Sequence, residues 1–242
     1  MCGRYASTRA TRALASIFEA SDVMGDESLE PNFNVAPTDP VRVVRRRSTG
    51  ERVVDLARWG LLPPWATEAR QGARMINARA ETVQTSPAFR TPFARRRCLV
   101  PADGWYEWLR SPDGRSKQAY YLTPKDSSVL AFAGLWQPWE GLLSTTIVTT
   151  AAVGDLAMVH DRMPLALPPE RWSSWLGSDG AAAGAGADLL AAPGLDWVAG
   201  IELRQVGSAV GDVRNNSEAL IRPVTGSALG VEPVESADLR LF

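Results

Sequence analysis

The sequence has 242 residues, of which 45% are hydrophobic and 22% are charged, and its net charge at neutral pH is −1. This composition is ordinary for a globular protein, and the near-zero charge excludes one drawn to nucleic acid by a global cationic field. No apolar run reaches the roughly 18 residues that a membrane span requires, and the N-terminus lacks an export signal, so we expect a cytoplasmic protein without a membrane partner.

The first half of the chain predicts one helix followed by short strands. Ser7 and the following TRATRALASIFEA predict an N-capped amphipathic helix, with Leu14, Ile17 and Phe18 on one face. A proline-rich connector, PNFNVAPTDP, leads to the β-branched run VRVVRRR. The Ser-Thr-Gly turn and the alternating residues after it predict a hairpin that ends at the paired prolines of WGLLPPW.

The second half predicts more short strands and one further amphipathic helix. RCLVPADGWYEW, AYYLTP, VLAFAGLW, LSTTIVTTAAV and VAGIELRQV are strand-like, and PPERWSSWL predicts a helix that starts at proline. Residues 177–188, rich in glycine and alanine, predict a flexible loop before a short LLAA helix. We therefore expect an α+β fold with a mainly antiparallel, barrel-like β core and flanking helices, in a single domain over residues 1–242.

Cys2 stands directly behind the initiator methionine. Because cysteine is small, we expect Met1 to be removed, which leaves an amine and a thiol on adjacent carbons. This 1,2-aminothiol has chemistry that an internal cysteine lacks; the alternative is that position 2 tolerates almost any residue. The other cysteine, Cys98, lies in an apolar strand and is expected to be inert core. Two cysteines and one histidine cannot form an ordinary zinc site, so we expect no metal and no cofactor.

His160, the only histidine, lies in MVHDRMPLAL beside charged residues at an expected strand-to-loop junction. It titrates near neutral pH and could move a proton for a carbonyl or an alkoxide. The alternative is a structural histidine.

Two further segments concentrate polar groups. In MINARAET, Asn77, Arg79 and Glu81 alternate, which places them on one face of an extended segment, either to bind a polar ligand or as a solvated outer face. In PADGWYEW, Glu107 lies between Tyr106 and Trp108. A carboxylate among aromatic rings is partly desolvated, which raises its pKa; the alternative is an exposed position on the strand.

Taken in order, the motifs resemble the SOS-response-associated peptidase (SRAP) family. The resemblance is carried along nearly the whole chain by MCGRYA, FNVAPT, WGLLPPW, NARAET, RRRCLVPADGWYEW, FAGLW, TTAAVGDL, VHDRMP and VGDVRNNSEALIRPV. Residues 177–188 match poorly, and Ser217 follows Asn216 where the family more usually has glycine. The resemblance implies the SRAP fold.

It also implies a reaction and a set of roles. Members of the family capture abasic sites in single-stranded DNA as a covalent thiazolidine crosslink, which protects the lesion during the DNA-damage response. By resemblance, the catalytic residues are Cys2, Asn77, Glu107 and His160. The residues implied to contact DNA are Arg4, Arg79, Arg162, Thr149, Trp65 and Trp105, although the core explains any single tryptophan equally well. We expect a monomer that associates with the nucleoid when it is bound to damaged DNA.

Three other activities stay open. An N-terminal cysteine with a histidine resembles a cysteine peptidase that acts on its own N-terminus or on peptides. The amine alone, through a Schiff base, could drive β-elimination and nick the strand, as an abasic-site lyase does. A non-covalent single-strand DNA-binding module would bind reversibly and with strong salt dependence.

Overall fold

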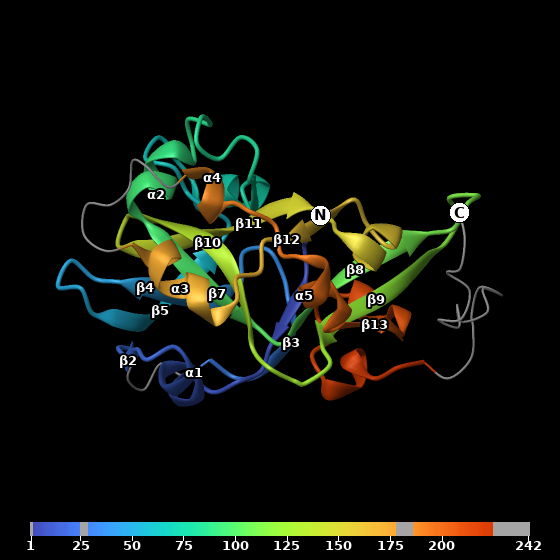
Figure 1. The fold of residues 1–242 in the computed structure, drawn as a ribbon. Coiled ribbons are helices and arrows are strands. Elements are labelled where there is room, and N and C mark those ends of the chain that lie inside the picture. Colours follow the sequence, from blue (N-terminus) through green and yellow to red (C-terminus); the bar gives the residue numbers. More distant parts are fainter. Residues whose placement is uncertain (1, 25–28, 178–185, 225–242) are drawn as a thin grey trace.

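A closed barrel of five strands forms the centre of the structure, a computed structural model that describes residues 2–24, 29–177 and 186–224 (Figure 1). The barrel strands are β4 (Pro40–Arg46), β5 (Arg52–Trp59), β7 (Arg97–Ala102), β10 (Leu130–Trp139) and β11 (Leu142–Ala151). They are hydrogen-bonded in the order β11-β10-β7-β4-β5, and β5 returns to β11 to close the ring. All of these contacts are antiparallel except β5–β11. The expected mainly antiparallel, barrel-like core is confirmed.

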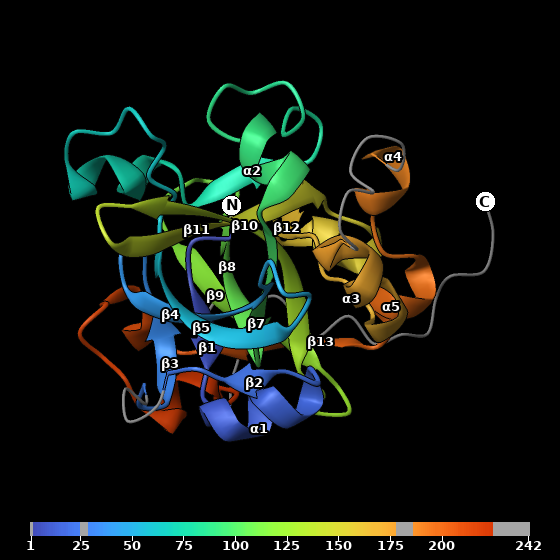
Figure 2. The same ribbon diagram turned by 90° about the vertical axis from the view of Figure 1, so that its left-hand side faces the viewer.

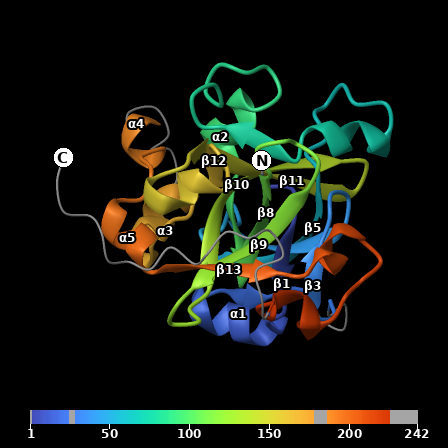
Figure 3. The ribbon, with the colours of Figure 1, turned by 90° about the vertical axis from the view of Figure 1, so that its right-hand side faces the viewer.

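A second, five-stranded antiparallel sheet carries the start of the described chain (Figure 3). Its order is β13 (Ile201–Val206), β9 (Lys117–Pro124), β8 (Gly104–Arg110), β1 (Tyr5–Ser7) and β3 (Asn32–Val35). Strand β8 follows β7 almost directly, so one chain segment passes from the barrel into this sheet. Three short strands extend the barrel sheet: β2 (Ser21–Asp22) pairs with β5, and β6 (Asn77–Arg79) and β12 (Arg162–Pro164) both pair with β11.

Helices surround the barrel rather than fill it. Figure 2 shows α1 (Thr11–Ile17) below the barrel, α2 (Arg90–Arg95) above it, and α3 (Pro169–Leu176), α4 (Gly186–Leu189) and α5 (Leu195–Ala199) along one side. Short 3₁₀ turns lie at η1 (Ala69–Arg74), η2 (Gly154–Met158), η3 (Ser208–Gly211) and η4 (Glu218–Ile221). Among the described residues, no helix has the length and apolar composition that crossing a bilayer requires.

Alternation along the barrel strands builds two apolar layers. Successive side chains on a strand point to opposite faces, so Val43 packs inside the barrel while its neighbour Val44 packs outside, against the helices. The outer layer contains Phe18 and Trp172, whose ring centroids lie 4.5 Å apart. A third cluster packs the second sheet against η3 and η4. Helices α1, α2 and α3 are therefore held by the outward face of the barrel, whereas α5 packs against η2 and β13.

Several predicted elements are confirmed. The VRVVRRR run and the alternating segment after it form the β4–β5 hairpin, with Arg46 opposite Arg52. PPERWSSWL forms α3, which begins at Pro169. The predicted residues Leu14 and Phe18 are buried on α1, whereas Ile17 is 37% exposed.

The predicted boundaries of three elements were wrong: those of the first helix, the last strand and the LLAA helix. Ser7 does not cap a helix: it ends β1, and α1 begins at Thr11 without a side-chain cap. Pairing of β1 with β3 and β8 extends this segment into a strand, so tertiary contacts override the local capping signal. The last strand was expected to begin at Val198, but α5 occupies that position and the strand begins at Ile201. The short helix α4 ends at Leu189, where the LLAA helix was expected to begin. Of the predicted flexible loop, residues 178–185 lie outside the described residues, as does Met1.

Gly104 lets β8 pack closely on β9. A Cβ atom there would lie 2.5 Å from the Leu122 carbonyl oxygen and 2.5 Å from a Tyr121 ring atom. Gly104→Ala is therefore expected to lower the free energy of unfolding by roughly 1–3 kcal/mol, because backbone cannot give way to the added methyl group. Urea denaturation measures this. Gly211→Ala is the control, since its Cβ would meet nothing within 4 Å, and an equal loss in both variants would contradict the argument.

Candidate active site

Cys2 lies immediately before β1 and has no exposed surface. Its backbone carbonyl accepts a hydrogen bond from Asn77 Nδ2 at 2.8 Å, which ties the start of the chain to β6. The Arg4 backbone N–H donates a hydrogen bond to the thiol. Burial raises the pKa of this thiol well above its usual value, and the charge of Glu107 adds to the effect. The N-terminal segment is therefore fixed in place, with its sulfur close to a carboxyl group.

Strand β11 gathers the other polar groups. Strand β6 pairs with it in parallel, with Asn77 opposite Ile147 and Arg79 opposite Thr149. Strand β12 pairs with it in antiparallel, which sets Arg162 opposite Ala151. Residues far apart in the sequence thus meet at the C-terminal end of a single strand.

Glu107 reaches the site from β8. The Tyr106 N–H donates to the Arg4 carbonyl at 2.9 Å, which aligns β8 with the N-terminal segment. The Glu107 side chain is buried, at 2% exposure, and burial raises the pKa of its carboxyl to about 7. The structure thus excludes the exposed alternative for this residue. A carboxyl with this pKa exists in both protonation states near neutral pH and suits proton transfer.

His160 lies between η2 and β12, with 27% of its side chain exposed. Nδ1 accepts a hydrogen bond from the Arg162 N–H at 2.9 Å and also lies 2.9 Å from Asp161 Oδ1. Burial lowers the pKa of the imidazole, so the ring is neutral near pH 7. We therefore assign Nδ1 as the acceptor of the hydrogen bond from the Arg162 N–H, and not as a protonated partner in an ion pair with Asp161. In that tautomer Nε2 carries the proton.

The three arginines of the predicted DNA surface differ in their surroundings. Arg79 is exposed. Arg4 is half-buried, and its Nη1 donates to Asn34 Oδ1 at 2.7 Å and to the Val210 carbonyl at 3.0 Å. Arg162 is mostly buried and makes a bidentate ion pair with Glu81.

The two tryptophans predicted to contact DNA differ in their exposure to solvent. Trp65 is 58% exposed, so its ring is accessible to a ligand. Trp105 has no exposed surface and packs edge-on against Phe132, with ring centroids 6.0 Å apart. The ring of Trp105 is enclosed in the core of this structure, which favours the core alternative for this residue, and its predicted contact with DNA stays a prediction.

Thr149 is buried beside Arg162. It is 1% exposed, and its Oγ1 accepts a hydrogen bond from Arg162 Nη2 at 3.3 Å. The hydroxyl thus bonds to another candidate residue, and the predicted contact of Thr149 with DNA stays a prediction.

Asn34 is a residue of the site that sequence reasoning missed. It is 2% exposed; its Oδ1 accepts from Arg4, and its Nδ2 donates to the carbonyls of Asp212 and Asn215 at 3.0 and 2.9 Å. It therefore connects Arg4 to the segment after β13. The sequence held one signal, the FNVAPT motif, without indicating which residue in it mattered.

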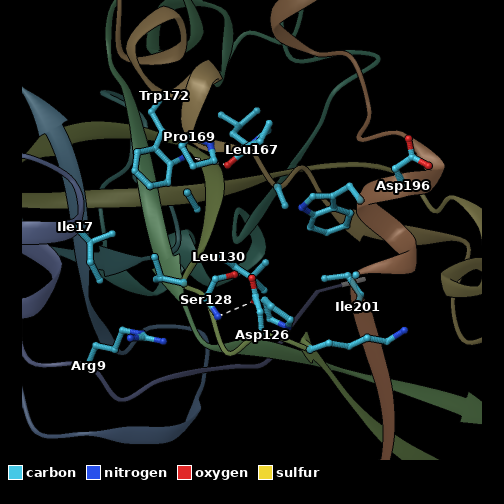
Figure 4. Close-up of a pocket in the computed structure, with 18 residues that line it drawn as sticks. Arg9, Ile17, Asp126, Ser128, Leu130, Leu167, Pro169, Trp172, Asp196 and Ile201 are labelled. Atoms are coloured by element: carbon cyan, nitrogen blue, oxygen red, sulfur yellow. Dashed lines mark hydrogen bonds between the residues drawn. The ribbon is translucent and has the colours of Figure 1, made fainter.

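No group of three or more histidine, cysteine, aspartate or glutamate side chains within the described part of the chain could hold a metal ion. A pocket of about 610 Å³ lies elsewhere, between α1, α3, α5 and the turn between β9 and β10 (Figure 4). Its walls include Ile17, Leu130 and Trp172, with Arg9 at its edge, and none of the predicted site residues lines it.

Cys2, fixed by Asn77 and coupled electrostatically to the buried carboxyl of Glu107, joins the five-stranded barrel as the feature that characterises this protein. Residues 1–213 match the family described as SOS response associated peptidase (SRAP). The chain belongs to this family, which confirms the resemblance found in the sequence.

Several relatives are similar over most of the chain. The abasic site processing protein YoaM of Bacillus subtilis is 35% identical over 227 residues, which cover 91% of this chain and 97% of that protein. The abasic site processing protein YedK of Escherichia coli is 32% identical over 235 residues, covering 93% and 100%. A crystal structure of a Bacteroides thetaiotaomicron protein, 22% identical, superposes with a TM-score of 0.76 over 93% of this chain and 100% of that one, which shows the same fold.

Proposed function

We propose that this protein captures abasic sites in single-stranded DNA as a covalent thiazolidine adduct through Cys2, and thereby protects the lesion during the DNA-damage response. One observation carries the proposal: Cys2 is held by Asn77 beside Glu107, a carboxyl whose pKa is about 7. Membership in the SRAP family and relatives named abasic site processing proteins support it. The protein would act in the cytoplasm, at the nucleoid when bound to damaged DNA.

The chemistry needs both groups of an N-terminal cysteine. The amine of Cys2 exists only after Met1 is removed, and with an ordinary pKa near 8 an α-amine is partly unprotonated at neutral pH. Its lone pair attacks the C1′ aldehyde of the opened abasic sugar, and loss of one water gives an imine. The thiol then adds to the imine carbon, and its proton ends on nitrogen. One C–N and one C–S bond form, and the five-membered ring resists hydrolysis better than the imine.

The neighbouring groups would move the protons. Glu107 in its acid form protonates the departing hydroxyl, and its carboxylate then accepts the thiol proton before this reaches nitrogen. Such positioned acid–base groups typically contribute 10²- to 10⁴-fold in rate. His160, with its proton on Nε2, would donate a hydrogen bond to the sugar ring oxygen while the hemiacetal proton moves to that oxygen and the ring opens, and Asn77 would orient the N-terminus through the Cys2 carbonyl.

The DNA-binding surface would be a local one. Arg4, Arg79 and Arg162 are the proposed phosphate ligands, and the exposed ring of Trp65 would stack on a base. A narrow arginine-lined surface is compatible with a net charge of −1. Because a missing base leaves nothing to read, recognition should be largely independent of sequence.

Arg79→Ala is expected to weaken binding equally for all single-stranded sequences. A plot of the logarithm of the association constant against the logarithm of the salt concentration has a negative slope, and removing one phosphate contact should reduce the magnitude of that slope by about 1. Fluorescence anisotropy over a salt series measures both quantities. Arg115→Ala, at an exposed position in the β8–β9 turn, is the control for the lost charge; equal effects in both variants would remove Arg79 from the proposed surface.

A denaturing gel tests the function. Untagged protein, with Cys2 confirmed as the first residue by mass spectrometry, is incubated with a single strand that carries one abasic site, beside the same strand with an intact base. A heat-stable shifted band that requires the lesion supports capture. A nicked strand without the band would indicate a lyase, and hydrolysis of peptides that depends on Cys2 would indicate a peptidase. Reversible binding alone would indicate a non-covalent module.

A further inference from the structure

The binding edge of Arg162 is already filled by a carboxylate. Nη1 donates to Glu81 Oε1 at 2.5 Å and Nη2 donates to Glu81 Oε2 at 3.0 Å. Nη2 also donates to the Thr149 carbonyl at 2.6 Å. Two parallel hydrogen bonds from one guanidinium to two oxygens are the geometry in which arginine binds either a carboxylate or a phosphate.

The rest of the guanidinium offers no second such edge. Arg162 Nε is buried and has no hydrogen-bond partner among the described residues, so its N–H is out of reach of a ligand in solvent. A phosphate that is to bind this arginine through two oxygens must therefore take the place of Glu81.

We infer that Glu81 is a placeholder carboxylate: it occupies the phosphate position of Arg162 until a phosphate of single-stranded DNA displaces it. The inference rests on the proposed function, and it assigns to Glu81 a role in setting affinity for the DNA backbone. Binding at this position is then an exchange of one anion for another.

The exposures show which partner moves. The Arg162 side chain is 13% exposed and is anchored to Thr149, whereas the Glu81 side chain is 52% exposed and follows β6 in a turn. An exposed carboxylate returns to water at little cost, while a buried guanidinium left without an anion is costly. Arg79, whose charge also acts on Glu81, would remain available to the same strand of DNA.

The experiment measures binding of an undamaged single-stranded oligonucleotide by anisotropy. Glu81→Gln keeps the shape of the side chain but removes its charge. Affinity for the oligonucleotide should therefore rise about two- to fivefold, because binding no longer has to break a partly exposed ion pair. Glu202→Gln is the matched control: Glu202 makes the same kind of bidentate pair with Arg204, on the edge strand β13. It changes the net charge equally and should leave affinity unchanged relative to wild type.

The result that overturns the inference is a Glu81→Gln affinity equal to or below that of Glu202→Gln. Equal affinity would mean that Glu81 does not compete, and lower affinity would mean that it holds Arg162 for the phosphate. Glu81→Ala provides a second variant if the glutamine one does not fold, with the same expectation. Adduct formation by the wild type is assayed in parallel: its absence refutes the proposed function, whereas its presence without tighter binding refutes the placeholder alone.

Discussion

Cys2→Ala is expected to abolish covalent capture completely. The variant keeps an α-amine, so a Schiff base can still form with the abasic aldehyde, but no sulfur is present to close the ring. The imine then hydrolyses, and the heat-stable band disappears from a denaturing gel. In the wild type the Cys2 backbone carbonyl accepts a hydrogen bond from Asn77 and the thiol accepts one from the Arg4 N–H, so the substitution removes only one small buried side chain.

Two comparisons make this result specific. Cys2→Ser keeps the amine and a hydroxyl of similar size, so any strand nicking should persist while the stable adduct is lost. A tag placed before Cys2 removes the free amine and should block both. Affinity for undamaged single strands should stay near that of the wild type in Cys2→Ala. A heat-stable adduct in that variant would show that another nucleophile carries the reaction.

Glu107→Gln is expected to slow adduct formation by about 10²- to 10⁴-fold, the usual contribution of a positioned acid–base group. Glutamine preserves the size and the hydrogen-bonding oxygen but can neither give nor take the proton. Single-turnover rates at saturating DNA measure this. The wild-type rate should change around pH 7, where the buried carboxyl titrates, and the variant should lack that inflection. Loss of DNA binding instead of rate would show a purely positional role.

The same substitution should stabilise the protein at alkaline pH. The pKa of Glu107 is about 7 in the folded protein against an ordinary value of 4.5, so the folded state holds its proton more tightly than the unfolded chain does. The free energy of unfolding therefore falls as pH rises from about 4.5 to about 7, by about 3 kcal/mol in total. Glu107→Gln removes this loss. The variant should exceed the wild type in stability above pH 7 and match it below pH 4.5.

Urea denaturation at pH 4.5 and pH 8 tests the sign. Glu51→Gln, at an exposed position in the β4–β5 hairpin, is the control for loss of a carboxylate. If the Glu107→Gln protein were less stable than the wild type at pH 8, ionisation of the buried Glu107 would not destabilise the folded protein, which contradicts the argument.

Local signals predicted the parts of the fold that local sequence controls. The β-branched runs around Ser-Thr-Gly predicted the β4–β5 hairpin, and proline followed by paired tryptophans predicted α3. The parallel contact between β5 and β11 that closes the barrel left no such signal, because its partners lie far apart in the chain and share no turn. Ser7 shows the opposite case, in which a strong local signal loses to strand pairing.

The candidate site divides in the same way. Residue type and spacing identified Cys2, Glu107 and His160 as chemically notable. Burial decides what each can do, and burial is a property of the fold: Trp105 looked as suitable for stacking as Trp65 until one proved enclosed and the other exposed. The pairing of Glu81 with Arg162 depends on β6 and β12 flanking β11, which no short motif encodes.

Strand β11, which draws its partners from distant parts of the chain, also sets an order of events during translation. Cys2 is among the first residues to leave the ribosome, whereas Asn77, Glu107 and His160 emerge progressively later. The segment around Cys2 is therefore synthesised well before the strands β6, β8 and β12. Because long-range strand pairing must follow synthesis of both strands, we expect the site to assemble only after β12 has left the ribosome. Under the proposed function, ribosome-bound and truncated chains would lack the complete set of groups for crosslinking.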